Sequence, residues 1–336
     1  MIRVGVIGYG YWGPNLVRNF QRCPGCTLVR VADLEPKRLA ACSRDWPCVD
    51  VTPDALEVTR ASDIDAVAIA TPIRTHFELA LDALRNGKHC LVEKPLACTA
   101  LQCETLIEEA RRRGLSLLVD HTFLYTEAVA WMKQFVSSDR LGDLYYLDFV
   151  RTNLGLFQHD ASVVWDLAPH DLSVMLEVTG RKPIGVSATG ARHAGSRVAD
   201  IAYLSMDLGD GALAHVHVNW LSPVKVRRIM VAGSQRMLVW DDMEATEKLK
   251  IYDSGVSVEQ ADVDGQPRTL VDYRIGDMTS PALAPREALQ TLVQHFLSCI
   301  RGEAKPRTGG EAGLEVVRIL EAAQHSMEHG GKSIRL

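Results

Sequence analysis

The first thirteen residues, MIRVGVIGYGYWG, constrain the fold more than any other stretch of the chain. Ile2–Ile7 is a short apolar run, typical of a strand buried on both faces of a parallel sheet. Gly8, Gly10 and Gly13 follow with the spacing G-x-G-x-x-G, and Pro14 stands where a helix tolerates a residue without an N–H. A strand, a glycine turn and a helix N-terminus together predict a site for the pyrophosphate of a dinucleotide.

The second predicted strand, Leu28–Ala32, supports this interpretation because it ends in Asp33, about 20 residues beyond the last glycine. A carboxylate there would bind a ribose 2′-hydroxyl and repel a 2′-phosphate, so NAD is favoured over NADP. Lys37 and Arg38 follow closely and could pair with a phosphate, so NADP stays open. The alternative is a glycine-rich turn in some other α/β domain.

Composition limits the class of protein. With 336 residues the chain is long enough for two domains. A formal net charge of −5 argues against a general nucleic-acid binder, which would normally be basic. No apolar run approaches the roughly 18 residues of a membrane span, and the chain opens on a core strand rather than a signal peptide, so we expect a cytoplasmic protein.

The sequence contains eight cysteines, which suit reduced thiols better than a disulfide framework. Cys23-Pro24-Gly25-Cys26 has the C-x-x-C spacing of a redox motif, but it falls between the first helix and the second strand. No second pair of similar spacing completes a four-cysteine zinc site. We therefore expect reduced thiols in a loop, and no metal site.

Strands alternate with helices up to about residue 120, which predicts an α/β fold with a doubly wound parallel sheet. Ligands of such sheets bind beyond the carboxyl ends of the strands. The segments expected to share that crevice are Gly8–Gly13, Asp33, Thr71–His76, Glu93–Pro95 and His121.

After this point the regular alternation of strands and helices ends, so we predict a dinucleotide-binding domain over residues 1–121 and a second domain over residues 122–336. Between Pro183 and Tyr273 several period-two patterns predict an open, mostly antiparallel sheet, with 212–220 the clearest. Helices are expected over about 286–301 and 310–327, where they could pack back on the first domain. A last short strand is expected over 333–336.

Asp166 and His170 are the first candidates for catalysis. The sequence pattern predicts a helix over Ser162–Val178, ending at Gly180. Pro169 suits only the first turn of a helix, however, which places the start of that helix near Asp166. Residues four apart share a helix face, and a carboxylate beside an imidazole makes a base with an orienting partner. The positive end of the helix would also keep His170 neutral. Alternatively, Asp166 is a helix N-cap and His170 is structural.

Lys94 is the second candidate. It follows a predicted strand and is joined to Pro95, at the edge of the sheet where the ligand is expected. A cation there could polarise a substrate hydroxyl or stabilise a developing alkoxide. Glu93 could pair with Lys94 or contact the nicotinamide end of the cofactor. The alternative is a solvated loop lysine.

With these residues in view, the whole chain resembles the Gfo/Idh/MocA oxidoreductases, the group of glucose–fructose oxidoreductase and inositol dehydrogenase. The resemblance is based on the glycine turn, on Thr71-Pro72 with Thr75-His76, on Glu93-Lys94-Pro95 and on Asp166-x-x-x-His170. It implies a Rossmann domain, and an open sheet that often forms dimer or tetramer interfaces. It also implies hydride transfer between nicotinamide C4 and a substrate carbinol. His170 would accept the hydroxyl proton, Lys94 would polarise the oxygen, and Asp166 would position the substrate and His170.

The resemblance also implies two sets of binding residues. The cofactor would contact Gly8, Gly10, Tyr11, Trp12, Gly13, Asp33, Thr71, Pro72, His76, Glu93, Lys94 and His121. The substrate would contact Lys94, Phe123, Tyr125, Arg151, Asn153, Trp165, Asp166 and His170.

The substrate itself is the least determined feature. The segment from Asn153 to Asp171 is similar to family members associated with surface-polysaccharide sugars, which favours a sugar or nucleotide sugar reacting at a ring hydroxyl, C3 by family analogy. Arg151 could bind a carboxylate or phosphate, or be a solvated ion-pair partner. A polyol such as inositol is one alternative substrate. A non-catalytic NAD-binding sensor is a second alternative function.

Overall fold

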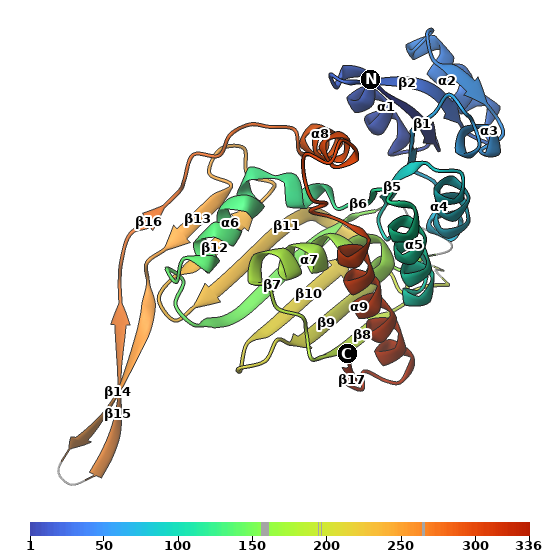
Figure 1. The fold of residues 1–336 in the computed structure, drawn as a ribbon. Helices are drawn as coiled ribbons and strands as arrows, with labels where there is room; N and C mark the ends of the chain where they lie inside the picture. Colours follow the sequence, from blue (N-terminus) through green and yellow to red (C-terminus); the bar gives the residue numbers. More distant parts are fainter. Residues whose placement is uncertain (156–160, 194, 196, 264–265) are drawn as a thin grey trace. The chain divides into compact units, whose positions relative to one another are not determined.

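The computed structural model describes residues 1–155, 161–193, 195, 197–263 and 266–336. It divides into two compact units, shown in Figure 1. The first unit contains Met1–Thr126 and Arg286–Glu321, and the second contains Glu127–Pro285 and Ala322–Leu336.

The first unit is built on a parallel sheet, which confirms the predicted doubly wound fold. Within the described residues this sheet has six strands in the order β3-β2-β1-β4-β5-β6. Its strands are β1 (Ile2–Ile7), β2 (Cys26–Ala32), β3 (Asp50–Thr52), β4 (Ala66–Ile69), β5 (His89–Glu93) and β6 (Leu117–Asp120). The intervening helices are α1 (Gly13–Arg22), α2 (Pro36–Asp45), α3 (Leu56–Thr59), η1 (Ile73–Thr75), α4 (His76–Arg85) and α5 (Ala100–Arg113).

The strand order reverses between β1 and β4, and ligands of open α/β sheets bind at this switch point. Gly8 leaves β1 there, and its N–H donates to the carbonyl of Ala32 at the end of β2. Gly8 has φ +97°, and a Cβ on it would lie 2.4 Å from the carbonyl oxygen of Ala70. The turn can therefore pass this close to β4 only with glycine at position 8.

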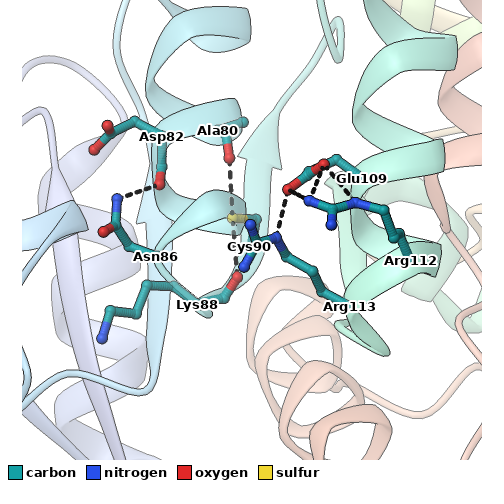
Figure 2. A network of polar contacts seen from close by, with 8 residues as sticks. All are labelled: Ala80, Asp82, Asn86, Lys88, Cys90, Glu109, Arg112 and Arg113. Atoms are coloured by element: carbon teal, nitrogen blue, oxygen red, sulfur yellow. Dashed lines mark hydrogen bonds and ion pairs between the residues drawn. The ribbon is translucent and has the colours of Figure 1, made fainter.

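At the opposite end of the strands, their amino end, polar contacts connect residues around α4, α5 and the start of β5; they are drawn in Figure 2. Asn86 caps α4 by donating to the carbonyl of Asp82 at 2.8 Å, and Glu109 on α5 pairs with Arg112 at 2.8 Å and with Arg113. Lys88, labelled in the same figure, donates to the carbonyls of Ala61 and Ile64 at 2.5 and 2.7 Å, and these two partners are not drawn as sticks there. These groups lie at the amino end of β5, so we assign them to stability rather than to ligand binding.

The C-terminal part of the first unit packs beside β6. This part comprises α8 (Ala288–Ile300) and the start of α9 (Gly310–Glu328). The N–H of Val119 donates to the carbonyl of Thr308 at 2.7 Å, and the hydroxyl of Tyr125 on η2 (Thr122–Tyr125) lies 3.1 Å from the Thr308 hydroxyl. The contacts hold η2, which follows the carboxyl end of β6, in place.

The second unit is built on a mixed, mostly antiparallel sheet, as the sequence predicts. Among the described residues the sheet has nine strands in the order β16-β13-β12-β11-β7-β10-β9-β8-β17, with β7 and β10 the parallel pair. The strands are β7 (Leu144–Leu154), β8 (Gly185–Ala191), β9 (Ile201–Asp207), β10 (Leu213–Asn219), β11 (Leu221–Gly233), β12 (Met237–Asp241), β13 (Leu249–Tyr252), β16 (Met278–Thr279) and β17 (Ile334–Arg335).

One face of this sheet is covered by helices, with α7 (Val163–Thr179) against β7, β9 and β10 and α6 (Glu127–Ser137) against α7 (Figure 1). The burial alternates accordingly along β9, where Ala202, Leu204 and Met206 are buried and Tyr203 is exposed. A separate antiparallel hairpin, β14 (Gly255–Val263) and β15 (Gln266–Arg274), extends away from the large sheet (Figure 1).

For the helix that contains Pro169, the predicted range Ser162–Val178 is confirmed, and the start near Asp166 expected from the proline is wrong. The helix α7 begins at Val163, after the N-cap Ser162, and Pro169 lies inside it rather than in its first turn. Val163 and Val164 are fully buried, and this burial extends the helix beyond the limit that proline alone would set. His170 is therefore beyond the first turn, where the helix dipole has faded, so the predicted dipole effect on its charge does not apply.

No helix in the described part of the chain is long and apolar enough to cross a membrane. All eight cysteines, including Cys23 and Cys26, are free thiols.

Candidate functional site

The glycine turn has the geometry of a dinucleotide site. A Cβ on Gly13 would lie 2.1 Å from the carbonyl oxygen of Gly8, so the turn closes on itself only without a side chain there. A Cβ on Gly10 would meet nothing nearer than the Arg38 guanidinium at 3.5 Å, which leaves the backbone of this residue open to a ligand. Helix α1 begins at Gly13 and has no side-chain cap on its first turn. The turn therefore fits a pyrophosphate bound by backbone N–H groups.

Asp33 follows β2 and is buried beside the turn. Its Oδ2 accepts the N–H of Tyr9 at 2.6 Å, and its Oδ1 accepts the N–H of Glu35 at 2.8 Å. Arg38 lies 3.5 Å from Oδ2 and is half exposed. The carboxylate thus holds the glycine turn against the end of β2, and an exposed cation stands next to it.

The turn after β4 is fixed by His76, which is fully buried at the start of α4. Its Nδ1 lies 2.9 Å from the carbonyl oxygen of Pro95 and its Nε2 lies 2.8 Å from that of Thr71. Burial lowers the pKa of His76, and the charge of Lys94 adds to this effect. The imidazole therefore ties the Thr71–Pro72 turn to the turn after β5.

Lys94 lies at the carboxyl end of β5, half-buried, with a cis peptide bond to Pro95. Its charge contributes to the lowered pKa of both His76 and His121, after the effect of their burial. His121 follows β6 and is almost fully buried, with burial as the main cause of a pKa of about 3. Neither ring nitrogen of His121 has a hydrogen-bond partner in the described part of the chain. It is a neutral imidazole with two buried polar atoms that the described residues leave without a partner.

Glu93 and Asp120 are opposite each other at the ends of β5 and β6. Oε2 of Glu93 accepts the N–H of Lys94 at 3.1 Å, and Oδ2 of Asp120 accepts the indole N–H of Trp12 at 2.8 Å. Burial, followed by the neighbouring Asp120, holds the pKa of Glu93 well above its usual range. The expected cofactor residues of the first unit thus converge on the carboxyl edge of its sheet. Tyr11 lies in the turn with its side chain exposed.

In the second unit, Asp166 and His170 lie one turn apart on α7, both half-buried. Oδ2 of Asp166 accepts the indole N–H of Trp220 at 3.1 Å. Trp220 is completely buried between β10 and β11, and its carbonyl accepts the N–H of Gly155. A rigid indole therefore fixes the carboxylate that shares a helix face with His170.

Arg151 on β7 is buried and forms a two-pronged ion pair with Asp171 on α7, with Nη2 2.7 Å from Oδ1 and Nε 3.0 Å from Oδ2. Of the two alternatives for Arg151, the ion-pair partner is present, but the pair is buried rather than solvated, because both side chains are at most 5% exposed. Contact of Arg151 with a substrate stays a prediction. The other predicted substrate residues lie on several elements. Asn153 is half-buried on β7, Trp165 is half-buried on α7, Phe123 is half-buried on η2, and Tyr125 is buried on η2.

Sequence reasoning missed Asp120, Trp220 and Asp171 as partners of predicted site residues. Trp220 offered the clearest signal, because it ends a period-two strand at a buried position and a buried indole N–H needs an acceptor. The sequence does not show which acceptor that is. Part of the segment compared with polysaccharide-sugar enzymes, residues 156–160, lies outside the described residues.

Comparisons with known proteins agree with this geometry. Residues 2–121 match the model of an oxidoreductase family with an NAD-binding Rossmann fold, and residues 129–239 match the GFO/IDH/MocA C-terminal domain. The UDP-N-acetylglucosamine 3-dehydrogenase of Acidithiobacillus ferrooxidans is 30% identical over 96% of this chain and 95% of its own. Its crystal structure superposes with a TM-score of 0.81 at 27% identity, covering 98% of this chain and 99% of that chain.

A more distant relative is the scyllo-inositol 2-dehydrogenase (NADP+) of Bacillus subtilis, 24% identical over 97% of this chain and 93% of its own. The family models together cover more than half of the chain, and the first relative matches it nearly end to end. The chain belongs to the Gfo/Idh/MocA family of oxidoreductases.

Proposed function

We propose that the protein is an NAD-dependent dehydrogenase that oxidises a ring hydroxyl, at C3, of a nucleotide sugar. The observation that supports the reaction best is the Asp166–Trp220 hydrogen bond, which fixes a carboxylate on the helix face that also presents His170. The similarity to a UDP-N-acetylglucosamine 3-dehydrogenase over the full chain supports the substrate class and the carbon.

In this mechanism His170 accepts the proton of the substrate hydroxyl as that hydroxyl becomes a carbonyl. Lys94 polarises the same oxygen and stabilises the negative charge that grows on it. Asp166, fixed by Trp220, orients both the substrate and His170. Bound NAD supplies the acceptor for the hydride that leaves the carbon. The substrate thus loses one proton and one hydride, which balances the oxidation.

The residues of the first unit fit the cofactor. Gly8, Gly10 and Gly13 let the backbone approach the pyrophosphate, and Asp33 provides the carboxylate for a ribose hydroxyl. The two unpartnered ring nitrogens of buried His121 would hydrogen-bond the cofactor. These assignments account for buried polar atoms that the described residues leave without partners.

The test is NAD reduction, followed at the absorbance of NADH, with UDP-N-acetylglucosamine, other nucleotide sugars, free sugars and inositols. We expect turnover of a nucleotide sugar, with a loss of about 10²- to 10⁴-fold in His170→Ala and about 10²- to 10³-fold in Lys94→Ala. Exposed residues of the same types, His329→Ala and Lys332→Ala, are the matched controls. Full turnover in both His170→Ala and Lys94→Ala would refute the mechanism.

Inositol is the second candidate substrate, because a full-length relative is a scyllo-inositol 2-dehydrogenase. Turnover of an inositol in preference to every nucleotide sugar would replace the proposed substrate and leave the catalytic residues intact. Labelling the product with borodeuteride would locate its carbonyl. Binding of NAD without turnover of any compound would favour a sensor.

The preference for NAD is proposed from Asp33, and the adjacent Arg38 makes it testable. Arg38 lies 3.5 Å from the carboxylate and is half exposed, so it could also meet a 2′-phosphate. We expect a higher kcat/KM with NAD than with NADP, and a further loss of NADP activity in Arg38→Ala but not in Lys37→Ala. A higher kcat/KM with NADP would contradict the assignment.

We also propose that the protein forms a homodimer or homotetramer through the open face of its second sheet. Tyr203 on β9 is 41% exposed there and stacks on His217 of β10 at 4.4 Å between ring centroids. Light scattering should give a dimer or tetramer, and Tyr203→Glu should shift it towards monomer. A monomeric unsubstituted protein would refute this proposal.

A further inference from the structure

Two acidic residues lie on neighbouring strands, at the C-terminal ends of the strands of the first sheet. Glu93 ends β5 and Asp120 ends β6, and the two residues are direct register partners in the parallel ladder. Asp120 is 2% exposed, and the Oε1 atom of Glu93 is also shielded from solvent. Two ionised carboxylates on register partners of neighbouring strands would repel each other strongly, because little water screens them.

Asp120 behaves as the ionised member of the pair. Its Oδ2 accepts the indole N–H of Trp12 at 2.8 Å, and its Oδ1 accepts the hydroxyl of Thr122. Both oxygens therefore receive hydrogen bonds from neutral donors, which is the arrangement that stabilises a carboxylate.

Glu93 is the member that holds a proton. Its Oε2 accepts the N–H of Lys94, whereas its Oε1 has no donor facing it anywhere in the described ranges of the chain. A buried acceptor without a donor is costly, but a protonated Oε1 becomes a donor itself, and Asp120 is the acceptor beside it. The pKa of Glu93 is raised in agreement with this, by burial first and then by the charge of Asp120 and a hydrogen bond to it.

Trp12 connects this pair to the cofactor turn. It is the N-cap residue of α1 and directly precedes Gly13, and its side chain makes no cap of its own. Its indole bonds instead to a residue 108 positions later in the chain. The position of Asp120 therefore determines where the end of the glycine turn and the start of α1 lie.

We propose that Glu93 and Asp120 share one proton, and that this singly charged pair is a positioning site that holds Trp12, and with it the glycine turn, in the conformation that binds the cofactor pyrophosphate. Neither carboxyl group needs to touch the reacting atoms. The inference rests on NAD as the bound cofactor, so its test measures NAD binding without turnover.

The test is the Kd for NAD, measured by calorimetry at pH 7 for five variants. Glu93→Ala should raise the Kd about tenfold, because it removes the donor to Asp120. Glu93→Gln should recover most of that affinity, because its amide donates to Asp120 and accepts from the N–H of Lys94 as the protonated acid does. Trp12→Phe and Asp120→Ala should each raise the Kd about tenfold or more, since each removes the hydrogen bond between the indole N–H and the Asp120 carboxylate. The double variant Trp12→Phe with Asp120→Ala should be little worse than either single one, because both remove the same bond.

The dependence on pH separates this role from a purely structural one. The ionisable groups around Glu93 are Asp120, Lys94 and His121, and Tyr125 also lies near Asp120. Alkaline pH removes the shared proton, so NAD binding by the unsubstituted protein should weaken there. Glu93→Gln keeps its N–H at every pH and leaves the other four groups in place, so its affinity should fall less.

Trp131→Phe and Glu108→Gln are the matched controls, since Trp131 stacks on Phe135 in the second unit and Glu108 is an exposed partner of Arg111. Both should bind NAD normally. A tenfold loss in Glu93→Gln at pH 7, additive losses in the double variant, or the same alkaline weakening in Glu93→Gln would each overturn the inference. Absence of NAD binding by the unsubstituted protein would overturn the proposed cofactor as well.

Discussion

The buried imidazole of His121 should make the ligand-free protein sensitive to mild acid. Burial, with the charge of Lys94 as a second cause, sets the pKa of this residue at about 3, against about 6.5 in an unfolded chain. Between pH 6.5 and pH 3 the unfolded state binds a proton on His121 that the folded state does not bind. The free energy of unfolding therefore falls as the pH drops from 6.5 towards 3, and is fully retained above 6.5.

The size of the effect follows from the two pKa values. Between pH 7 and pH 5, a histidine that titrates near 6.5 when unfolded and near 3 when folded removes about 2 kcal/mol from the free energy of unfolding. His121→Leu abolishes this contribution. At pH 7 the substitution itself should cost no more than about 1 kcal/mol, because neither ring nitrogen has a partner within the described residues and the two side chains are of similar volume.

Urea unfolding of the cofactor-free protein at pH 7 and pH 5 measures the difference. The unsubstituted protein should lose about 2 kcal/mol more over this interval than His121→Leu. Leu118→Met, a volume-conserving change of a buried residue on strand β6, which precedes His121, should lose as much as the unsubstituted protein. If His121→Leu and the unsubstituted protein have the same dependence on pH, a buried neutral His121 is refuted.

Three further predictions concern other parts of the molecule. Gly10→Ala should fold normally, because the added Cβ meets only the flexible side chain of Arg38. It should bind NAD at least about tenfold more weakly by calorimetry, because the same Cβ would obstruct the cofactor, and unchanged affinity would contradict this. Arg151→Met should lower the free energy of unfolding by about 3–5 kcal/mol, because it leaves Asp171 buried and unpaired. Arg151→Met with Asp171→Leu should recover much of that loss, as measured by urea unfolding. A double variant as unstable as the single one would argue against the pair. Burial raises the pKa of Cys26 to about 12, so a thiol reagent at pH 8 should modify exposed Cys48 first, and the reverse order would contradict the burial.

The features predicted correctly from sequence are those written in a few consecutive residues. The strand Ile2–Ile7, the glycine turn and the start of α1 depend on apolar periodicity, on the spacing of three glycines and on one proline. The alternation of strands and helices then implied the parallel sheet, because such connections have few alternatives.

The features that sequence could not supply are pairings between distant residues. Trp12 donates to Asp120 and Trp220 to Asp166, across 108 and 54 positions, and no local pattern distinguishes these acceptors from other carboxylates. Pro169 misled for a related reason. Its local preference for a first turn was overridden by the burial of Val163 and Val164, which only the folded sheet determines.

The same long-range pairs give helix α7 a defined rotation about its axis. Successive residues of a helix point about 100° apart, so Asp166 and His170 differ by about 40° whereas Asp171 points about 100° away from His170. Trp220 holds Asp166 on one side of the helix, and Arg151 holds Asp171 on another. Two buried bonds in different directions fix the rotation, and the direction of His170 follows from it. A change at Asp171 should therefore disturb the proposed base without any contact between Asp171 and the substrate, so stability and catalysis are coupled through this helix.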